Sequence, residues 1–554
     1  MVNMTTTDHR FLTPELKRWR EGIYSQFRLF REELQAGVAQ REAEADAAAR
    51  QSHESRAMFV ANTWLRETVE NFCLLDGVLN LFSSDAEIKD WAKAKAGAFE
   101  NDVNRLAMED KHAAIRYIVE QLERLDLELP EPIADYMAAG GYKNAKHKQE
   151  FGGVLGRLFS VRWWTRKVRV LQARALEKMC REMGFVHAKA GKYCSDYTLR
   201  RRWHQQRRNA DLLASLVATN QDGQAFTLGE LSALGVANPV LRRLELMARI
   251  GGFERLAAKT GLFVPVFYTL TCPSKFHAFH VSGECNAKWN RSTPREAQAY
   301  LNSVWALVRA AWDKAGIRAF GFRVVEPHHD GCPHWHMILW FSPDKHEKAT
   351  AIFQHYAIQE DLEELRQRDG SLNIEPRFKP VIIDESKGTA AGYVVKYVSK
   401  NIDGHGVESD SYGGCAIDSA MRIEAWSTTW GIRQFQQIGG PSVTVWRELR
   451  RARDDVLLDD DEFEKIQAAA NQGDWSSFTE LMGGPLVARN DMPIRAHMVA
   501  RVERNDYDEI VMKISGVAYH GEVAITRRHE WTISIRRAST YEQYCRYRAP
   551  PSAA

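Results

Sequence analysis

Cysteines are few in this sequence, and none is arranged as a C-x-x-C pair. The eight cysteines are scattered over 554 residues, which argues against both a disulfide framework and a zinc ribbon. Disulfide-free chains of this kind are typical of reducing compartments. We therefore expect the protein to be cytoplasmic.

Long apolar runs and nucleotide-binding loops are missing as well. No stretch of about 18 apolar residues could span a bilayer, and residues 1–20 lack the apolar core of a signal peptide. We expect no membrane span and no membrane partner. The sequence G-x-x-x-x-G-K-[ST] is also absent, so we expect no ATP-driven motor of the P-loop kind.

The composition that remains is that of an ordinary globular protein, with 44% hydrophobic and 27% charged residues. The net charge of +3 favours no particular partner. Because the chain is too long for one core, we predict four regions and an α+β fold class. These regions are a helical N-terminal region (1–150), a basic helical DNA-binding region (151–260), a domain with a central antiparallel sheet (261–445) and a small β-containing appendage (446–554).

Positive charge is concentrated in residues 157–208, which hold 15 lysines and arginines against three acids. Aromatic residues are interleaved with these cations. Cations hold phosphates and aromatic rings stack on bases, so this segment is typical of a nucleic-acid surface. The alternative is a solvated helix face above buried tryptophans. The residues that we expect to contact DNA are Arg162, Arg166, Lys167, Arg200, Arg201, Arg202, Arg207 and Arg208.

Residues 262–445 alternate between strand and helix patterns. The order β-α-β-β-α-β-α, with a hairpin turn at Asp330-Gly331, predicts an antiparallel α+β sandwich. We predict strands at 263–271, 320–326, 333–341 and 379–384. We predict helices from Pro294 to Gly316, over 347–367 and over 388–399.

The hairpin carries the densest cluster of possible metal ligands in the chain. His334 and His336 lie two residues apart, so on a strand both imidazoles face the same side. If the loop holds three residues, 330–332, then Glu326 lies opposite His336 and shares its face. A loop of two residues would turn Glu326 away. A histidine-rich surface hairpin without a metal is the structural alternative.

We predict His334 and His336 as ligands of one divalent metal ion. Glu326 is the expected third ligand, and His328 is the alternative. Imidazole mixed with carboxylate suits Mg²⁺ or Mn²⁺ acting on phosphate oxygens, although Zn²⁺ also accepts these ligand types.

Two tyrosines downstream are candidate nucleophiles. Tyr393 and Tyr397 are four residues apart, which places both on one helix face. Lys396 and Lys400 share a neighbouring face and could steady a phosphate or a phenolate. A free tyrosine has a pKa of about 10, so it needs a charged neighbour or a base to act at neutral pH.

A second tyrosine pair competes with this assignment. Tyr193 and Tyr197 have the same spacing, but their segment is a poorer helix former and falls in the basic region. We favour the later pair. For either pair, packing on an amphipathic helix is the structural alternative.

The combination of these motifs resembles a known family. His334-Trp335-His336, preceded by Glu326-Pro-His-His-Asp-Gly and followed by a Tyr-x-x-x-Tyr helix, resembles HUH endonucleases with two tyrosines. More narrowly, the chain resembles the bacteriophage replication gene A protein family, the rolling-circle replication initiators of tailed phages. The strand 267–271 is similar to the first motif of that superfamily. The resemblance is strongest over residues 262–445.

The resemblance implies a central antiparallel sheet with the histidine pair on a middle strand and the tyrosine helix beside it. It implies that the enzyme nicks one strand of a replication origin. Tyr393 or Tyr397 would retain the 5′ end as a phosphotyrosine and free a 3′-hydroxyl primer, and the other tyrosine would act after a round of synthesis. Its partners would be single-stranded or extruded origin DNA and, in the bacterial host cell, a replicative helicase and polymerase.

Other functions share some of these features. A two-tyrosine HUH transposase would use the same chemistry. A conjugative relaxase fits less well, because its tyrosine normally lies upstream of the histidines. A regulator that binds DNA through residues 157–208 and cuts nothing is a hypothesis from another class. It leaves the spacing of the metal and tyrosine motifs unexplained.

Overall fold

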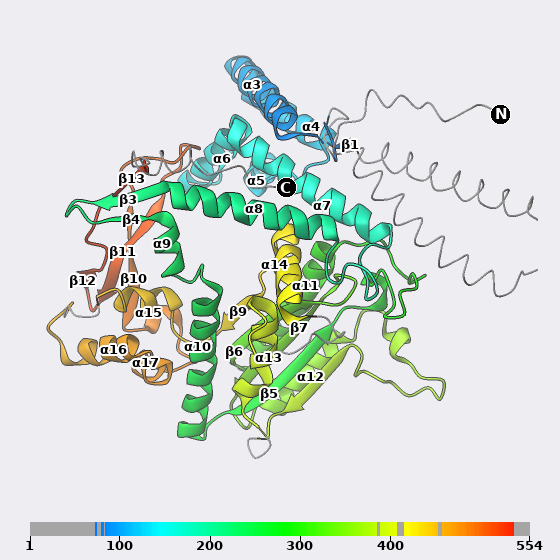
Figure 1. Cartoon of the computed structure of the whole chain (residues 1–554), viewed down its shortest axis with the longest axis vertical. Helices are drawn as coiled ribbons and strands as arrows, with labels where there is room; N and C mark the ends of the chain where they lie inside the picture. Colours follow the sequence, from blue (N-terminus) through cyan, green and yellow to red (C-terminus); the bar gives the residue numbers. More distant parts are fainter. Residues whose placement is uncertain are drawn as a thin grey trace, which may run out of the picture. The chain divides into compact units, whose positions relative to one another are not determined.

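The computed structural model describes residues 73–74, 79–81, 83–384, 388–406, 415–452 and 457–536 (Figure 1). These residues form two compact units. The first contains the described residues up to Met179 together with Val502–Val511, and the second contains Cys180–Arg501 and the residues from Met512 onward. Helices and antiparallel sheets make up both, so the predicted α+β class is confirmed.

The first unit is mainly helical. Its strands and helices are β1 (Cys73–Leu74), β2 (Leu79–Asn80), α3 (Asp85–Glu109), α4 (Lys111–Arg124), α5 (Glu131–Ala139), α6 (Ala145–Leu158) and the first part of α7 (Val161–Glu182). Ser84 begins α3 with a capping box, and Asp110 caps α4 through its carboxylate. Phe99 and Trp164 stack in the core with ring centroids 5.7 Å apart. The helical prediction for residues before Cys73 lies outside the described residues.

The second unit is built around a five-stranded antiparallel sheet with the order β8-β5-β7-β6-β9. The strands are β5 (Val264–Thr271), β6 (Phe320–Pro327), β7 (Pro333–Phe341), β8 (Phe378–Ile382) and β9 (Phe435–Ile438). The first four were predicted, and β7 lies in the middle as the resemblance implied. The edge strand β9 was missed because its four residues, Phe-Gln-Gln-Ile, show no clear alternation.

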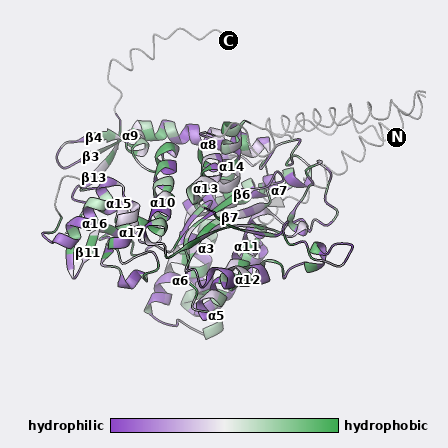
Figure 2. Cartoon of the chain, turned by 90° about the horizontal axis from the view of Figure 1, so that it is seen from below, coloured by the Kyte–Doolittle hydropathy of each residue, from purple (hydrophilic) through white to green (hydrophobic). Residues whose placement is uncertain are grey.

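Helices cover both faces of this sheet. One face packs against α11 (Pro294–Lys314), α12 (His346–Ala357) and α14 (Ala416–Trp430), and the other packs against α10 (Pro239–Thr260) and α13 (Ala390–Ile402). Because both faces are covered, β6 and β7 are nearly fully buried and carry apolar residues on both faces. Figure 2 shows the chain coloured by hydropathy. The predicted helix over 347–367 is shorter than expected and ends at Ala357, and α14 was missed.

The remaining elements of the second unit form two small sheets and several helices. The sheet β13-β3-β4 joins β3 (Leu216–Asn220) and β4 (Ala225–Thr227) to β13 (Trp531–Ile535), and the sheet β10-β11-β12 contains β10 (Ile494–Ala500), β11 (Met512–Tyr519) and β12 (Glu522–Ile525). The helices are α8 (Asp196–Ser215), α9 (Leu228–Ala233), α15 (Val443–Leu449), α16 (Asp461–Gln472) and α17 (Trp475–Leu481), with short 3₁₀ turns η3 (Ser274–Phe276), η4 (Leu362–Leu365) and η5 (Arg489–Asp491). None of the helices within the described residues is both long and apolar enough to cross a membrane.

Candidate active site

The β6–β7 hairpin positions the histidine pair. Its register pairs Glu326 with His334 and Pro327 with Pro333, so the loop between the strands holds five residues, 328–332. The predicted three-residue loop, with Glu326 opposite His336, is therefore wrong. The observed pairing differs from the predicted pairing by two residues. A change of register by an even number of residues leaves each side chain on the same face of the sheet. Glu326 consequently still faces the same side of the sheet as both histidines.

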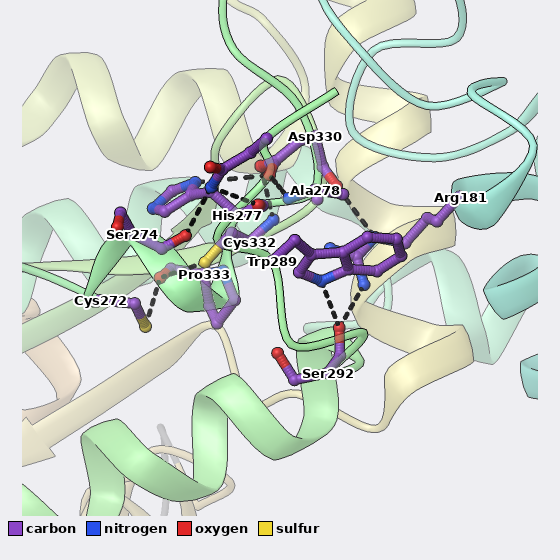
Figure 3. Close-up of polar contacts among 12 residues, drawn as sticks. Arg181, Cys272, Ser274, His277, Ala278, Trp289, Ser292, Asp330, Cys332 and Pro333 are labelled. Atoms are coloured by element: carbon purple, nitrogen blue, oxygen red, sulfur yellow. Dashed lines mark hydrogen bonds and ion pairs between the residues drawn. The ribbon is translucent and has the colours of Figure 1, made fainter. Parts of the chain in front are cut away.

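The loop of this hairpin is held in place by Asp330 (Figure 3). The Asp330 carboxylate is fully buried and accepts hydrogen bonds from the backbone N–H groups of Ala278 at 2.8 Å and Cys332 at 3.0 Å. It also lies 3.3 Å from Nδ1 of His277. Burial by itself would raise the pKa of Asp330, but the charge and hydrogen bond of His277, together with the charges of Arg181 and His328, outweigh it and hold this pKa well below its usual range. Asp330 therefore serves to anchor the loop.

Arg181 binds the same loop from outside. Its Nε donates to the backbone oxygen of Asp330 at 3.0 Å, and its Nη1 donates to the backbone oxygen of Ser292 at 2.8 Å. The guanidinium lies over the ring of Trp289, 5.4 Å from its centroid. One cation of the basic segment 157–208 thus has a structural role in the described protein, which the charge count did not predict.

Glu326, His334 and His336 form a compact group of metal-ligand atoms, the one such group among the described residues. The two Nε2 atoms of the histidines lie 2.8 Å apart. Oε2 of Glu326 lies 4.0 Å from Nε2 of His334 and 3.7 Å from Nε2 of His336. All three side chains project from paired positions of the sheet, which fixes their spacing.

The two imidazoles are in the neutral form that can bind a cation. Burial lowers the pKa of His336 to about 3, with the charge of Lys400 acting in the same direction, and burial also lowers the pKa of His334 well below its ordinary value. Both rings are therefore neutral at neutral pH. Nδ1 of His336 lies 3.2 Å from the Thr269 hydroxyl, a second contact that orients the ring and leaves Nε2 for a ligand bond.

His328 has a different place from the three grouped residues. It belongs to the hairpin loop, and its ring centroid lies 4.1 Å from that of His334. Its Nε2 is buried and, within the part of the chain that is described, has no hydrogen-bond partner. The structure thus brings Glu326 together with the histidine pair, while the ring of His328 packs against His334.

Two residues at the end of α13 bind the Glu326 carboxylate. Nζ of Lys400 lies 3.2 Å from Oε2, and the Asn401 amide donates to Oε1 and, at 2.6 Å, to the backbone oxygen of Tyr397. Lys400 is buried, whereas Lys396 is exposed. Lys400 therefore contacts Glu326, the candidate third ligand. Asn401 was missed, although its spacing of four residues from Tyr397 places it on the tyrosine face.

The tyrosine helix lies directly against the histidine pair. The ring of Tyr397 stacks on the imidazole of His336 with centroids 3.9 Å apart, and Phe267 on β5 packs 5.7 Å from Tyr397 and 6.0 Å from Tyr393. Tyr393 is 40% exposed. Burial raises the pKa of Tyr397, and the Glu326 carboxylate raises it further. The Tyr397 phenol therefore needs a cation or a base before it can act as a nucleophile.

The competing tyrosine pair is not on one helix. Tyr193 precedes α8, has a φ of 69° and is fully buried, whereas Tyr197 lies within α8. The two rings therefore do not share a helix face as a second nucleophile pair requires.

The residues predicted to bind DNA are divided between two helices. Arg162, Arg166 and Lys167 belong to the part of α7 in the first unit, and the other five belong to α8 in the second unit. Arg162 forms an exposed ion pair with Asp506 at 2.8 Å. Arg202 binds both carboxylate oxygens of Glu424. The exposed side chains of this set are those of Arg162, Arg166, Arg200, Arg207 and Arg208.

The fold and the site together define a sheet protein in which a histidine pair, a carboxylate and a tyrosine helix meet on one face. Residues 86–405 match the family model of the bacteriophage replication gene A protein. The chain belongs to this family.

Its relatives include the replication gene A protein of Escherichia phage 186, which is 39% identical over 71% of this chain and 57% of the relative. The replication protein of Haemophilus phage HP1 is 36% identical over 70% of this chain and 50% of the relative. A probable replication endonuclease from a prophage-like region of Salmonella paratyphi A is 34% identical over 66% of this chain and 46% of the relative. The chain thus spans about half the length of these relatives. No solved structure is a significant match.

Proposed function

We propose that the protein is a phage replication initiator, a metal-dependent endonuclease that nicks one strand of an origin and later rejoins it. The observation that carries the proposal is the 3.9 Å stacking of Tyr397 on His336. A candidate nucleophile and a candidate metal ligand come from distant parts of the sequence and meet on one face of the sheet. The names of the relatives, which include replication proteins and a probable replication endonuclease, support the same activity.

The chemistry follows from the residues that surround the site. His334, His336 and Glu326 would hold Mg²⁺ or Mn²⁺, which when bound polarises a phosphate and stabilises its developing charge. The Tyr397 phenol gives up its proton to solvent, and its oxygen attacks the phosphorus. The bond from phosphorus to the 3′ oxygen breaks, and that oxygen takes a proton from solvent and leaves as a hydroxyl. The 5′ end stays on the enzyme as a phosphotyrosine. Because Tyr397 is packed against the sheet, its phenol meets the phosphate in a defined orientation.

The second tyrosine suits the return reaction. Tyr393 lies one helical turn before Tyr397 and is more exposed, so it can receive a second strand while the first remains attached. The phosphotyrosine conserves the energy of the broken phosphodiester, so resealing needs no ATP. This agrees with the absence of a P-loop, and strand separation and synthesis would fall to a helicase and a polymerase of the bacterial host.

Covalent capture tests the proposal. The purified protein would be incubated with Mn²⁺ and end-labelled single-stranded oligonucleotides that tile the replicon encoding it. We expect one oligonucleotide to yield a protein–DNA adduct, with the linked peptide containing Tyr397 or Tyr393 by mass spectrometry. An adduct that persists in Tyr393→Phe/Tyr397→Phe, or that needs no divalent ion, would overturn the proposal.

A further inference from the structure

A polar cavity opens in the unit that carries the tyrosine site. Its volume is about 570 Å³, which is in the range of small-ligand sites. It lies at the β9 edge of the central sheet, between the first half of α10 and the segment 439–447. None of the residues assigned to metal binding or nicking lines it.

Positive charge dominates the lining of this cavity. Five arginines line it against a single carboxylate, that of Glu245, and the other lining residues are neutral; the arginines are Arg242, Arg249, Arg433, Arg447 and Arg489. Glu245 is already bound by Arg447, whose Nε and Nη2 lie 3.0 and 2.7 Å from its two oxygens. Arg433 and Arg489 are exposed, and neither forms an ion pair within the described residues. The cavity therefore has an uncompensated excess of cations suited to an anion.

Arg249 is the one buried arginine among the five that line the cavity. This side chain is only 7% exposed. Its Nη1 donates to Gln437 at 2.9 Å and its Nη2 lies 3.5 Å from an oxygen of Glu245, but its Nε is buried and has no hydrogen-bond partner among the described residues. Burial lowers the pKa of Arg249 to about 10, although the charge of Glu245 opposes this. A buried N–H group without an acceptor costs free energy, and an anion or another acceptor bound at the Arg249 Nε would remove that cost.

Aromatic rings accompany the guanidinium groups. The Arg242 guanidinium lies 5.3 Å from the ring centroid of Phe435, which is half-buried, and that of Arg249 lies 5.4 Å from the ring centroid of Phe322. Stacked rings and cations are the two features that bind the base and the phosphate of a single-stranded nucleotide. An inorganic anion would use only the second of them.

Two glycines bring the segment 439–447 close to the sheet. Gly439 and Gly440 have φ values of 63° and 68°, and a Cβ on Gly440 would lie 2.5 Å from the ring of Phe253. Only glycine fits both the backbone conformation and this close approach. The hydroxyl residues Ser442 and Thr444, which follow directly, thereby line the cavity.

The cavity and the tyrosine site share one face of the sheet. Phe322 and Glu326 are both on β6 and differ by four positions, so their side chains point to the same side. At the usual rise of a strand they are about 13 Å apart along β6. With about 3.4 Å per nucleotide in a duplex strand, this separation corresponds to at most about four nucleotides.

We propose that this cavity binds a nucleotide of single-stranded DNA a few positions away from the nicked bond. Arg242, Arg433 and Arg489 hold its phosphate, and its base packs against Phe435. This inference depends on the proposed function in one respect, namely that the bound strand is the strand that is nicked. A free deoxynucleotide carries the same base and phosphate groups, so the experiments must distinguish a DNA strand from a free nucleotide.

Salt-dependent binding is the first measurement. Arg433→Gln/Arg489→Gln removes two exposed cations of the cavity, and Arg295→Gln/Arg309→Gln removes two exposed cations of α11, on the opposite face of the sheet. The full chain would be titrated without metal against a fluorescent 20-nucleotide single strand at several salt concentrations. We expect the cavity variant to bind about tenfold more weakly, with a salt slope reduced by about 0.7, the value for one lost phosphate contact. The α11 variant should match the unaltered protein, and equal effects of the two variants would overturn the proposal.

Photocrosslinking identifies the ligand. Single strands carrying 5-iodouracil at successive positions should crosslink to the peptide containing Phe435 from one or two positions only, and millimolar dTTP or inorganic phosphate should not displace them. Displacement by dTTP alone would assign the cavity to a free nucleotide and overturn the strand assignment. Displacement by phosphate alone, or crosslinks at no position, would also overturn it. Because these measurements need no cleavage, a protein that crosslinks normally but never forms a phosphotyrosine would refute the proposed function and leave this inference intact.

Discussion

The imidazole of His336 lies between Tyr397 and Thr269. The phenol ring stacks on it at 3.9 Å, and the threonine hydroxyl lies 3.2 Å from its Nδ1. One histidine on the central strand thus contacts both the tyrosine helix and a neighbouring strand. This geometry couples the position of the Tyr397 phenol to the position of His336, the candidate metal ligand.

Removing the histidine pair should abolish cation binding. In His334→Ala/His336→Ala only Glu326 remains of the three grouped ligands, and a single carboxylate already bound to Lys400 is a weak site for Mn²⁺. Titration of the protein with Mn²⁺, followed by electron paramagnetic resonance of the free ion, should show one site in the unaltered protein and none in the variant. His346→Ala/His355→Ala, on α12, is the matched control and should keep the site.

The two tyrosines should differ in the first cleavage. Tyr397 stacks on His336, whereas Tyr393 contacts Phe267 at the exposed end of the helix. We expect Tyr397→Phe to reduce the rate of first adduct formation by more than about 100-fold, since the nucleophile itself is removed. Tyr393→Phe should form the first adduct at nearly the normal rate but fail in strand rejoining. Equal loss of the first cleavage in both variants would contradict this order.

Lys400 should stabilise the protein when no metal is bound. Its ammonium lies 3.2 Å from a Glu326 oxygen and both groups are buried, so Lys400→Met leaves a buried carboxylate without its charged partner. Breaking such a pair costs about 3–5 kcal/mol. Thermal unfolding should show a clearly lower midpoint for Lys400→Met, which saturating Mn²⁺ partly restores because it supplies the missing positive charge. Lys396→Met, one turn earlier and exposed, should leave the midpoint within error.

Asp330 should control both the stability and the pH response of the hairpin. Asp330→Asn removes a buried carboxylate that binds His277 and two backbone N–H groups, and we expect a loss of about 3 kcal/mol. The pKa of Asp330 is lowered and, although burial opposes it, the pKa of His277 is raised by Cys332 and Asp330.

The sign of the pH dependence follows from these directions. The Asp330 contribution is complete above its ordinary pKa of 3.8 and is lost as pH falls through the lowered value. The His277 contribution is complete below its ordinary pKa of 6.5 and is lost as pH rises through the raised value. The difference in melting temperature between the unaltered protein and Asp330→Asn should therefore be largest between about pH 4 and pH 6.5. A difference that grows steadily toward pH 9 would contradict the ion pair.

Several features could be predicted because they depend on local sequence. Thr293-Pro294 and Glu296 specify the start of α11 through a capping box. The apolar runs of β6 and β7 predict buried strands, and their period of two places His334 and His336 on one face. The spacing of Tyr393 and Tyr397 predicts one helix face in the same way. Each of these inferences needs only neighbours within a few residues.

Other features depend on residues that are distant in the sequence. The five-residue hairpin loop is held by Asp330, which binds His277 and Ala278, and by Arg181 from the end of α7, so the turn sequence alone predicted the wrong register. Lys400 was expected to stabilise a phosphate or a phenolate, but in the structure it binds Glu326, which lies on β6. The histidine and tyrosine motifs could therefore be predicted from the sequence, since side-chain direction follows from backbone periodicity. The contact of Tyr397 with His336 and the arginine-lined cavity at β9 were decided by the tertiary structure, because long-range packing alone brings those elements together.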